Sequence, residues 1–536
     1  MNLQQDRIAG AEYRAPQDNG QTGRRTRNGV KTVSARLFAG LLLSATAGCY
    51  SVNLNGDGTN PSPDGTFTSP ECQSSATPIP RANEGNWTLV VLNDVIPGDE
   101  QFTCGNGEPY KFFVQFNTGA TDLTVALEPG GACWDYETCE HQAGVLNPVR
   151  LEAVPDDLMT NLNYKPWAAM YPHFGRIDNS VPTNKYNHVF FPYCTGDAFT
   201  GDTEKTYYPS GAGEPVEVRH HGRRNLEAAA QWLAQTFPSG YVGQLLVIGS
   251  SAGAVGATAN YPLIRDTISP QCGAMINDSG PIFPPKGGQF GGLYPPYIPS
   301  QQQGLLDRVS ASWDLMAPGA IVEQLDNRFG NNWYRLLRDN IGHINRGLAR
   351  AYPDDRFLFT TFKQDLNFSV FSFVGGGAIA PGSDIAEQVL DMWQSEVADF
   401  KAWIKSDSKE NWGYYLPNFR PDFCSHMVAT SPLTLVHDRN GYARAGIAGH
   451  ADGYYRTEIG SMNLGDAIRQ LLDRDQDIPR VDADPDPTQL SFTSETGEGV
   501  ANDDWYGLYS GELIPDKQAY IDAELEDCVF TNGYPN

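Results

Sequence analysis

The nine residues 245–253, Leu-Leu-Val-Ile-Gly-Ser-Ser-Ala-Gly, most constrain what this chain can fold into. An apolar strand runs directly into Gly-x-Ser-x-Gly, and a helical pattern over Ala252–Ile268 follows at once. Small residues around the central serine permit a sharp strand-to-helix turn in which Ser251 takes a strained backbone. The turn raises the Ser251 hydroxyl above the sheet, beside the N–H of Ala252, which can stabilise an oxyanion. We therefore predict Ser251, rather than Ser250, as a nucleophile. The alternative is a tightly packed turn without chemistry.

The order of apolar runs along the chain predicts the fold class. Short strand-like runs alternate with helical spacing, which favours an α/β fold with a mainly parallel sheet flanked by helices. Residues 279–307, dense in Pro, Gly and Tyr, predict an irregular lid-like loop. The predicted strands are 88–92, 110–116, 123–127, 188–191, 244–249, 274–276 and 357–362, and the predicted helices are 225–237, 252–268, 385–404 and 467–472.

The first 48 residues have the pattern of a secretory signal. They hold seven basic and three acidic residues, and a basic stretch precedes about twelve apolar or small residues. The apolar run is too short for a membrane-spanning helix, which needs roughly 20 residues. It ends in Thr-Ala-Gly-Cys, which resembles a bacterial lipoprotein box and predicts Cys49 as a lipid anchor. An ordinary signal peptide is the alternative.

The predicted domain organisation follows from composition. Residues 1–48 form the signal peptide, and 49–85, rich in Asn, Gly, Pro and Ser, form a flexible tether. Residues 86–465 form the catalytic domain, and 466–536 form an acidic C-terminal extension packed on it. The acidic run 482–486 predicts a solvated loop rather than a cation site.

Charge and cysteine content narrow the function classes. The net charge of −26 excludes nucleic acid as an expected partner, because phosphate binding needs a basic face. Nine cysteines leave eight for disulfides if Cys49 is acylated, and long, stapled loops outside the cytoplasm are then expected. Among them, Cys133 and Cys139 form a plausible local pair. We also expect Cys72 to pin the end of the tether to the body.

A second loop carries consecutive glycines after the predicted strand 123–127. Hydrolases of this architecture place an oxyanion-binding N–H on such a loop, and glycines allow close approach of the backbone to substrate. Gly130 and Gly131 are therefore candidates for the oxyanion hole, together with Ala252. A plain Pro-Gly-Gly turn is the alternative.

Five segments occur in order over residues 123–283: 127–139 with its Cys-x5-Cys, 187–202 with Tyr-Cys-Thr-Gly-Asp-Ala-Phe-Thr-Gly, 221–224, 249–253 and 276–283. Together they resemble the pectin acetylesterase/Notum family of serine esterases with an α/β-hydrolase fold. Two departures occur: Pro129 stands in place of a Gly, and Ala132 precedes the cysteine because the family's Trp is displaced. In the family that aromatic lies beside the acyl pocket.

Serine esterases on such a sheet order their triad as Ser, then Asp or Glu, then His. Four histidines follow Ser251: His343, His426, His437 and His450. Phe-Cys-Ser-His at 423–426 resembles a late family segment and favours His426 as the base, with His437 second. For the acid, Asp365 follows the predicted strand 357–362, while Asp278 is the rival and resembles a structural Asp of the family.

The resemblance implies a hydrolase that removes O-acetyl groups from a polysaccharide such as pectin through an acyl-enzyme. The negative charge of the chain disfavours free pectate as the polymer. Two alternatives stay open: a lipid-acyl or general carboxylesterase of the Notum branch, which a deep apolar pocket would support, and a non-catalytic surface binding lipoprotein. No metal or cofactor is expected. We expect a monomer whose contact with membranes is the N-terminal anchor.

Overall fold

The computed structural model describes residues 69–81, 83–98, 101–140, 149–160, 182–286, 298–330, 337–338, 340–379, 385–407, 410–418, 426–429 and 458–483. Cys49, Cys424, Cys528, His437 and His450 lie outside these residues, as does the predicted signal peptide. Among the described residues no helix combines the length and the apolar character that a membrane crossing requires. The described residues also contain no group of three or more His, Cys, Asp or Glu side chains that could hold a metal ion.

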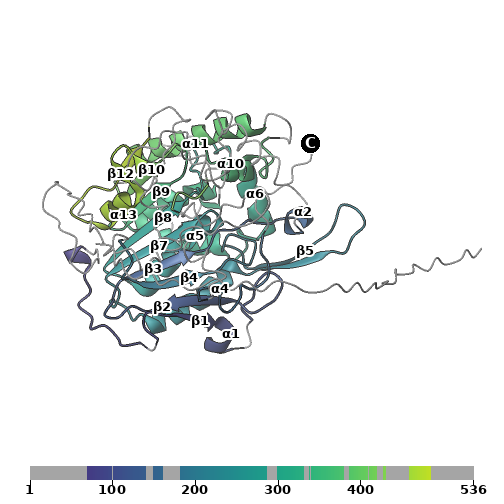
Figure 1. Cartoon of the computed structure of the whole chain (residues 1–536). Helices are drawn as coiled ribbons and strands as arrows, with labels where there is room; N and C mark the ends of the chain where they lie inside the picture. The colour runs from purple at the N-terminus through teal and green to yellow at the C-terminus, as the bar shows by residue number, and fades with distance from the viewer. Residues whose placement is uncertain are drawn as a thin grey trace, which may run out of the picture. The chain divides into compact units, whose positions relative to one another are not determined.

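A nine-stranded sheet forms the centre of the described part (Figure 1). Strand β2 runs antiparallel to both of its neighbours, and every other pair in the sheet is parallel. This order, with one antiparallel strand near one edge, is the α/β-hydrolase arrangement expected from the sequence. In spatial order the strands are β1 (Trp87–Val91), β2 (Lys111–Gln115), β4 (Asn187–Phe191), β3 (Leu123–Leu127), β7 (Gln244–Ser250), β8 (Cys272–Asp278), β9 (Arg356–Thr360), β10 (Trp412–Leu416) and β13 (Arg480–Asp482).

Both faces of the sheet are covered, which explains why its central strands are apolar throughout rather than alternating. On β7, Leu245 and Val247 belong to one core cluster, while Leu246 and Ile248 belong to another. The first cluster is completed by α4 (Gly222–Thr236), α5 (Ala252–Ile268) and α11 (Ile385–Asp407), and the second by α13 (Leu464–Leu472).

Several elements were not predicted. Two of them are the short helices α6 (Gln303–Ser312) and α7 (Ile321–Phe329). Because α6 begins inside the predicted lid-like loop 279–307, residues 303–307 are helical and not irregular as predicted. The helices α9 (Ile344–Ala351) and α10 (Leu366–Phe373) flank β9 in the sequence. A hairpin of β5 (Thr203–Tyr207) and β6 (Val216–His220) stands apart from the main sheet.

The last strand also corrects the sequence interpretation of the acidic run. Asp482 ends β13 and pairs with Lys363 and Lys401, so this residue belongs to the sheet edge and not to a solvated loop. A strand of three residues carries too little periodicity to be recognised without its neighbours.

Three disulfides staple the described chain: Cys72–Cys272, Cys104–Cys194 and Cys133–Cys139. The first ties the end of the predicted tether to the start of β8, as expected, and the third is the local pair suggested by spacing. Disulfides are typical of chains that fold in an oxidising compartment.

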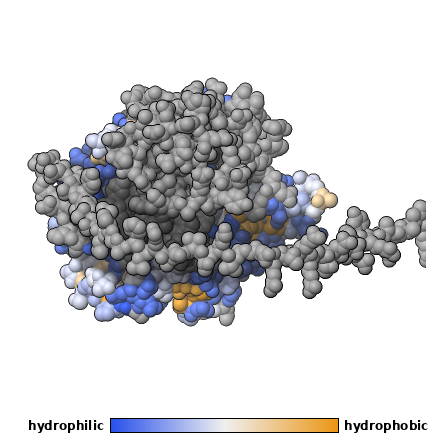
Figure 2. All heavy atoms as spheres, viewed as in Figure 1, coloured by the Kyte–Doolittle hydropathy of each residue, from blue (hydrophilic) through white to orange (hydrophobic). Residues whose placement is uncertain are grey.

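One face of the molecule shows the polarity of part of the described surface. In the view of Figure 2 the coloured surface is mostly blue to white with a few small orange areas. Among the described residues the exposed large hydrophobic side chains are Ile79, Val95, Tyr208 and Ile298, which lie far apart in the sequence. Isolated exposed apolar residues are usual on soluble domains and mark no interface by themselves.

Candidate active site

The carboxyl ends of the parallel strands bring the candidate residues to one edge of the sheet. Leu127 of β3 lies opposite Gly249 of β7, and Ser250 lies opposite Asp278 of β8. Asp278 in turn pairs with Thr360 of β9. In open α/β sheets, ligands bind beyond the carboxyl ends of the strands, and this edge carries every described candidate residue.

The turn after β7 has the strained geometry expected of a nucleophile. Ser251 has φ 53° and ψ −124° and is the N-cap of α5. A side chain on Gly249 would lie 2.0 Å from the carbonyl oxygen of Gly253. One on Gly253 would lie 2.2 Å from the carbonyl oxygen of Leu127, at the end of β3. The two outer glycines are therefore required by backbone packing, and strain of this kind is often stored at active sites.

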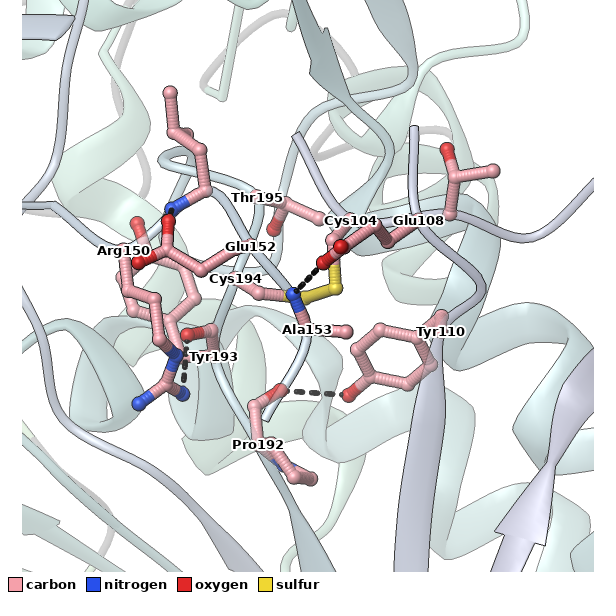
Figure 3. The surroundings of a disulfide bond; sticks show 12 residues. Cys104, Glu108, Tyr110, Arg150, Glu152, Ala153, Pro192, Tyr193, Cys194 and Thr195 are labelled. Atoms are coloured by element: carbon pink, nitrogen blue, oxygen red, sulfur yellow. Dashed lines mark hydrogen bonds between the residues drawn. A yellow bond between two sulfur atoms is a disulfide. The ribbon is translucent and has the colours of Figure 1, made fainter. Parts of the chain in front are cut away.

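The glycine loop after β3 is held in place by a buried ion pair. Glu128, 1% exposed, accepts hydrogen bonds from Arg150 and from the backbone N–H of Tyr193, the latter at 2.7 Å. Arg150 also donates to the carbonyl of Tyr193, as Figure 3 shows beside the Cys104–Cys194 disulfide. A side chain on Gly130 would meet the Tyr193 ring at 2.5 Å. These contacts fix the loop that carries Gly130 and Gly131.

Ala252 supplies the first N–H of α5. The first four N–H groups of a helix have no intrahelical acceptor, so this group is available to a developing negative charge. Gly130, Gly131, Ser251 and Ala252 all line one cavity. The three predicted oxyanion-hole residues thus lie together beside the candidate nucleophile.

Asp365 and His426 form a buried hydrogen-bonded pair. The carboxylate Oδ2 of Asp365 lies 2.8 Å from Nδ1 of His426, and the two side chains are 0% and 1% exposed. Asp365 also caps α10 by accepting from the N–H of Phe368 at 2.9 Å. Burial raises the pKa of Asp365, while the charge of His426 and their hydrogen bond act in the opposite direction.

The second nitrogen of the imidazole is free for chemistry. Nε2 of His426 has no hydrogen-bond partner among the described residues, although it is buried. The ring stacks on Phe368, with centroids 6.1 Å apart and planes inclined by 24°. A hydrogen bond at Nδ1 orients the ring and leaves Nε2 to accept a proton, as an Asp–His pair does in serine hydrolases.

The other candidates for the acid and the base have different surroundings. Asp278 contacts Ser250 and the backbone after His426, but its carboxylate makes no hydrogen bond to the imidazole among the described contacts. His343 has its Nδ1 3.2 Å from Arg346, and burial lowers its pKa to about 3. Two of the four histidines after Ser251 are described, His343 and His426, and of these His426 pairs with an aspartate.

The cavity at Ser251 has mainly apolar walls, and its empty volume of about 930 Å³ includes open solvent at its mouth. Ala252, Val255 and Ala259 line it along one face of α5, and seven residues of helix span about 10 Å. Its other walls come from α6, α7, α9 and α10, through Leu305, Leu306, Val309, Ile321, Val322, Leu325, Ile344, Phe368 and Phe371.

Sequence reasoning missed these walls. The apolar spacing of Leu305, Leu306 and Val309 was a signal for a helix, but nothing in it showed which cavity the helix would face. Trp134, the displaced aromatic, packs edge-on against Phe371, with ring centroids 5.3 Å apart. It therefore lies behind a residue of the cavity wall.

A buried aspartate shapes one side of the cavity. Asp197 accepts from Thr195 Oγ1 and from the N–H groups of Phe199, Gly201 and Gly222. Burial raises its pKa to about 7, although these hydrogen bonds oppose the rise. The loop that it holds contributes Ala198 and Thr200 to the cavity. The loop matches one of the similar segments found in the sequence.

The pectinacetylesterase family model matches residues 86–284. Palmitoleoyl-protein carboxylesterase NOTUM of Drosophila melanogaster is 28% identical over 172 residues, 31% of this chain and 23% of that protein. The human enzyme of the same name is 24% identical over 170 residues, 31% of this chain and 30% of its own length. The chain thus spans under a third of the length of either relative.

The chain is also similar to an inactive relative and to a solved structure. An inactive palmitoleoyl-protein carboxylesterase of Danio rerio, notum1b, is 29% identical over 108 residues, which are 19% of this chain and 69% of that protein. A crystal structure of the Wnt deacylase Notum from Drosophila aligns with a TM-score of 0.41 and 16% identity over 75% of this chain and 96% of the other.

The matched segment holds the Glu128 loop, the Asp197 loop and the Ser251 turn, whereas Asp365 and His426 lie beyond it. The family model and the Notum relatives both describe carboxylic ester hydrolases. Residues 86–284 of the chain match the pectinacetylesterase family model, and the chain resembles the Notum carboxylesterases over a segment of similar length.

Proposed function

We propose that the chain is a serine carboxylic ester hydrolase that accepts esters with an extended apolar acyl group. The observation that carries the proposal is the apolar cavity that begins at Ser251 and follows α5 for two turns. The hydrogen-bonded pair of Asp365 and His426 at the same edge of the sheet supplies the other groups that the reaction needs.

In the proposed reaction the Ser251 hydroxyl attacks the ester carbonyl, and His426 takes the hydroxyl proton through Nε2. Asp365 holds the imidazole at Nδ1 and stabilises its charged form. The N–H groups of Ala252 and of Gly130 or Gly131 stabilise the oxyanion. His426 then protonates the leaving alcohol, and water, deprotonated by the same histidine, cleaves the acyl-enzyme.

The apolar walls favour a fatty acyl chain over acetate. Burying a methylene group contributes about 0.8 kcal/mol, so each added carbon that enters the cavity should strengthen binding of the transition state. An acetyl group would leave most of the apolar lining without a partner. The names of the Notum relatives, which describe palmitoleoyl-protein carboxylesterases, agree with this choice of acyl group.

O-acetyl polysaccharide is the second candidate substrate. The match of residues 86–284 to the pectinacetylesterase family favours it. The net charge of −26 works against a polyanionic polymer, because like charges repel over a Debye length of about 8 Å at physiological salt. A neutral or esterified glycan would avoid this repulsion.

A series of nitrophenyl esters from acetyl to palmitoyl, with acetate release from acetylated pectin alongside, tests the choice. The proposal expects kcat/KM to rise from acetyl through the medium chains, with little acetate released from pectin. Highest activity on the acetyl ester and on pectin would favour the second candidate. Inactivity on all substrates would favour a binding protein, a role consistent with the existence of an inactive relative.

We further propose that the protein works outside the cytoplasm, held by a lipid on Cys49. The three disulfides support the compartment, since such bonds persist in oxidising surroundings. The Thr-Ala-Gly-Cys sequence supports the anchor. Metabolic labelling with a fatty acid, lost on Cys49→Ser, would test it.

A further inference from the structure

Two neighbouring residues at the end of β8, Asp278 and Ser279, connect the segment of the candidate nucleophile to that of the candidate base. On one side, Ser250 Oγ donates to Asp278 Oδ2 at 2.7 Å, and the N–H of Ser251 donates to the Asp278 carbonyl at 2.8 Å. Asp278 thus holds both the side chain before the candidate nucleophile and the backbone of that nucleophile itself.

On the other side, the same two residues hold the backbone that follows His426. The N–H of Met427 donates to Ser279 Oγ at 3.1 Å. The N–H groups of Val428 and Ala429 donate to the two carboxylate oxygens of Asp278, at 2.7 and 3.2 Å. Three successive backbone donors after His426 therefore end on this dipeptide.

The backbone at these contacts is strained in three places. Ser251, Ser279 and Met427 have φ values of 53°, 58° and 62°, a region that non-glycine residues seldom occupy. Such conformations cost energy and persist where the surroundings over-determine them. All three residues take part in the hydrogen bonds just described, so these bonds hold the strained turns.

The carboxylate of Asp278 is fully buried and carries the hydrogen bonds of an ionised acceptor. Burial raises its pKa, while the bonds from Ser250, Ala429 and Val428 and the charge of His426 act in the opposite direction. Four donors surround the two oxygens, counting the weaker contact from Ser279 Oγ at 3.3 Å. An amide at this position could not accept from all of them, because its nitrogen is a donor.

We infer that Asp278 and Ser279 are positioning residues, which lock the Ser251 turn and the His426 segment into one rigid unit. The inference rests on the proposed function, since it assigns the two residues a task in that reaction. Asp278, the rival for the triad acid, would thereby act on His426 through the backbone, whereas Asp365 contacts the imidazole directly.

The test compares Asp278→Asn and Ser279→Ala with Asp355→Asn as a matched control. Asp355 is equally buried and accepts from Tyr261, Arg265 and the N–H of Gly273, but it precedes β9, at the opposite edge of the sheet. All three variants should lose stability. We expect kcat on a nitrophenyl ester to fall about a hundredfold in Asp278→Asn and less in Ser279→Ala, with KM within threefold of the parent value. Asp355→Asn should keep kcat per folded molecule.

Hydrogen exchange provides a second measurement that does not need activity. The amides of Met427, Val428 and Ala429 should exchange faster in Asp278→Asn than in Asp355→Asn at equal global stability. Unchanged exchange, or a kcat of Asp278→Asn that falls no further than that of the control, would overturn the inference. If the parent protein cleaves no ester, the proposed function fails, and the exchange rates alone then decide whether the two residues hold the segment.

Discussion

The carboxylate of Asp365 lies 2.8 Å from Nδ1 of His426, with both side chains buried beside the carboxyl ends of β8 and β9. Sixty-one residues separate the two in the chain. The structure thus brings together the candidate acid and the candidate base, which lie far apart in the sequence.

Asp365→Asn should lower kcat by about 10³–10⁴-fold with little change in KM. The amide keeps the shape of the side chain but cannot stabilise an imidazolium, and it favours the wrong tautomer of the ring. Steady-state kinetics on a nitrophenyl ester would measure the loss. A variant that keeps more than a tenth of the parent kcat would exclude Asp365 as the triad acid.

Ala259→Leu should shorten the acyl chain that the enzyme accepts. Ala259 is buried two turns along α5 from Ser251, where extra carbons would fill the inner part of the cavity. In the parent protein each methylene that enters should raise kcat/KM about fourfold until the cavity is full. The variant should lose this gain for long esters and keep its activity on acetyl and butyryl esters, which serve as its internal control. Equal losses on all chain lengths would refute the acyl role of the cavity.

Acid should destabilise the protein through His220. Burial lowers the pKa of His220 from 6.5 to about 4. Between these two pH values His220 is therefore protonated in the unfolded chain but neutral in the folded chain. Its contribution to the free energy of unfolding is complete above pH 6.5. It is lost as the pH falls towards 4, by on the order of 3 kcal/mol.

The variant His220→Asn isolates this contribution. An amide can keep the donor to the Thr195 carbonyl, which Nδ1 of His220 approaches at 3.0 Å, but it takes up no proton. Urea unfolding at a series of pH values should give a shallower acid slope for the variant. Parallel slopes would show that His220 titrates alike in both states.

Removal of the Cys72–Cys272 disulfide should cost more stability than removal of Cys133–Cys139. The two bonds join residues 200 and 6 positions apart, and a longer loop restricts the unfolded chain more. We expect the Cys72→Ser/Cys272→Ser variant to lose about 2–5 kcal/mol in urea unfolding. A larger loss from the short loop would mean that local strain or packing outweighs chain entropy.

The sequence predicted what is encoded locally. β3 and α5 have their predicted bounds, Leu123–Leu127 and Ala252–Ile268, because an uninterrupted apolar run and a helix after Gly-x-Ser-x-Gly each carry their own signal. The three candidate oxyanion-hole residues follow soon after the ends of two strands, so their place beside Ser251 was also encoded locally, and their role stays a prediction.

The walls of the cavity and the task of Asp278 could not be predicted. Each depends on contacts between segments far apart in the chain, such as Asp278 with Val428, 150 residues later. A strand-end aspartate has the same local sequence whether it touches a histidine ring or the backbone behind it. Only the contacts in the folded structure therefore distinguish Asp365, which bonds the imidazole, from Asp278, which bonds the backbone after His426.

Labelling with a fluorophosphonate, followed by peptide mapping, tests the central claim that Ser251 is an activated nucleophile. We predict a single adduct on Ser251 in the parent protein, its absence in Ser251→Ala, and slow labelling in Asp365→Asn. No adduct on the parent protein, or an adduct that persists in Ser251→Ala, would contradict it.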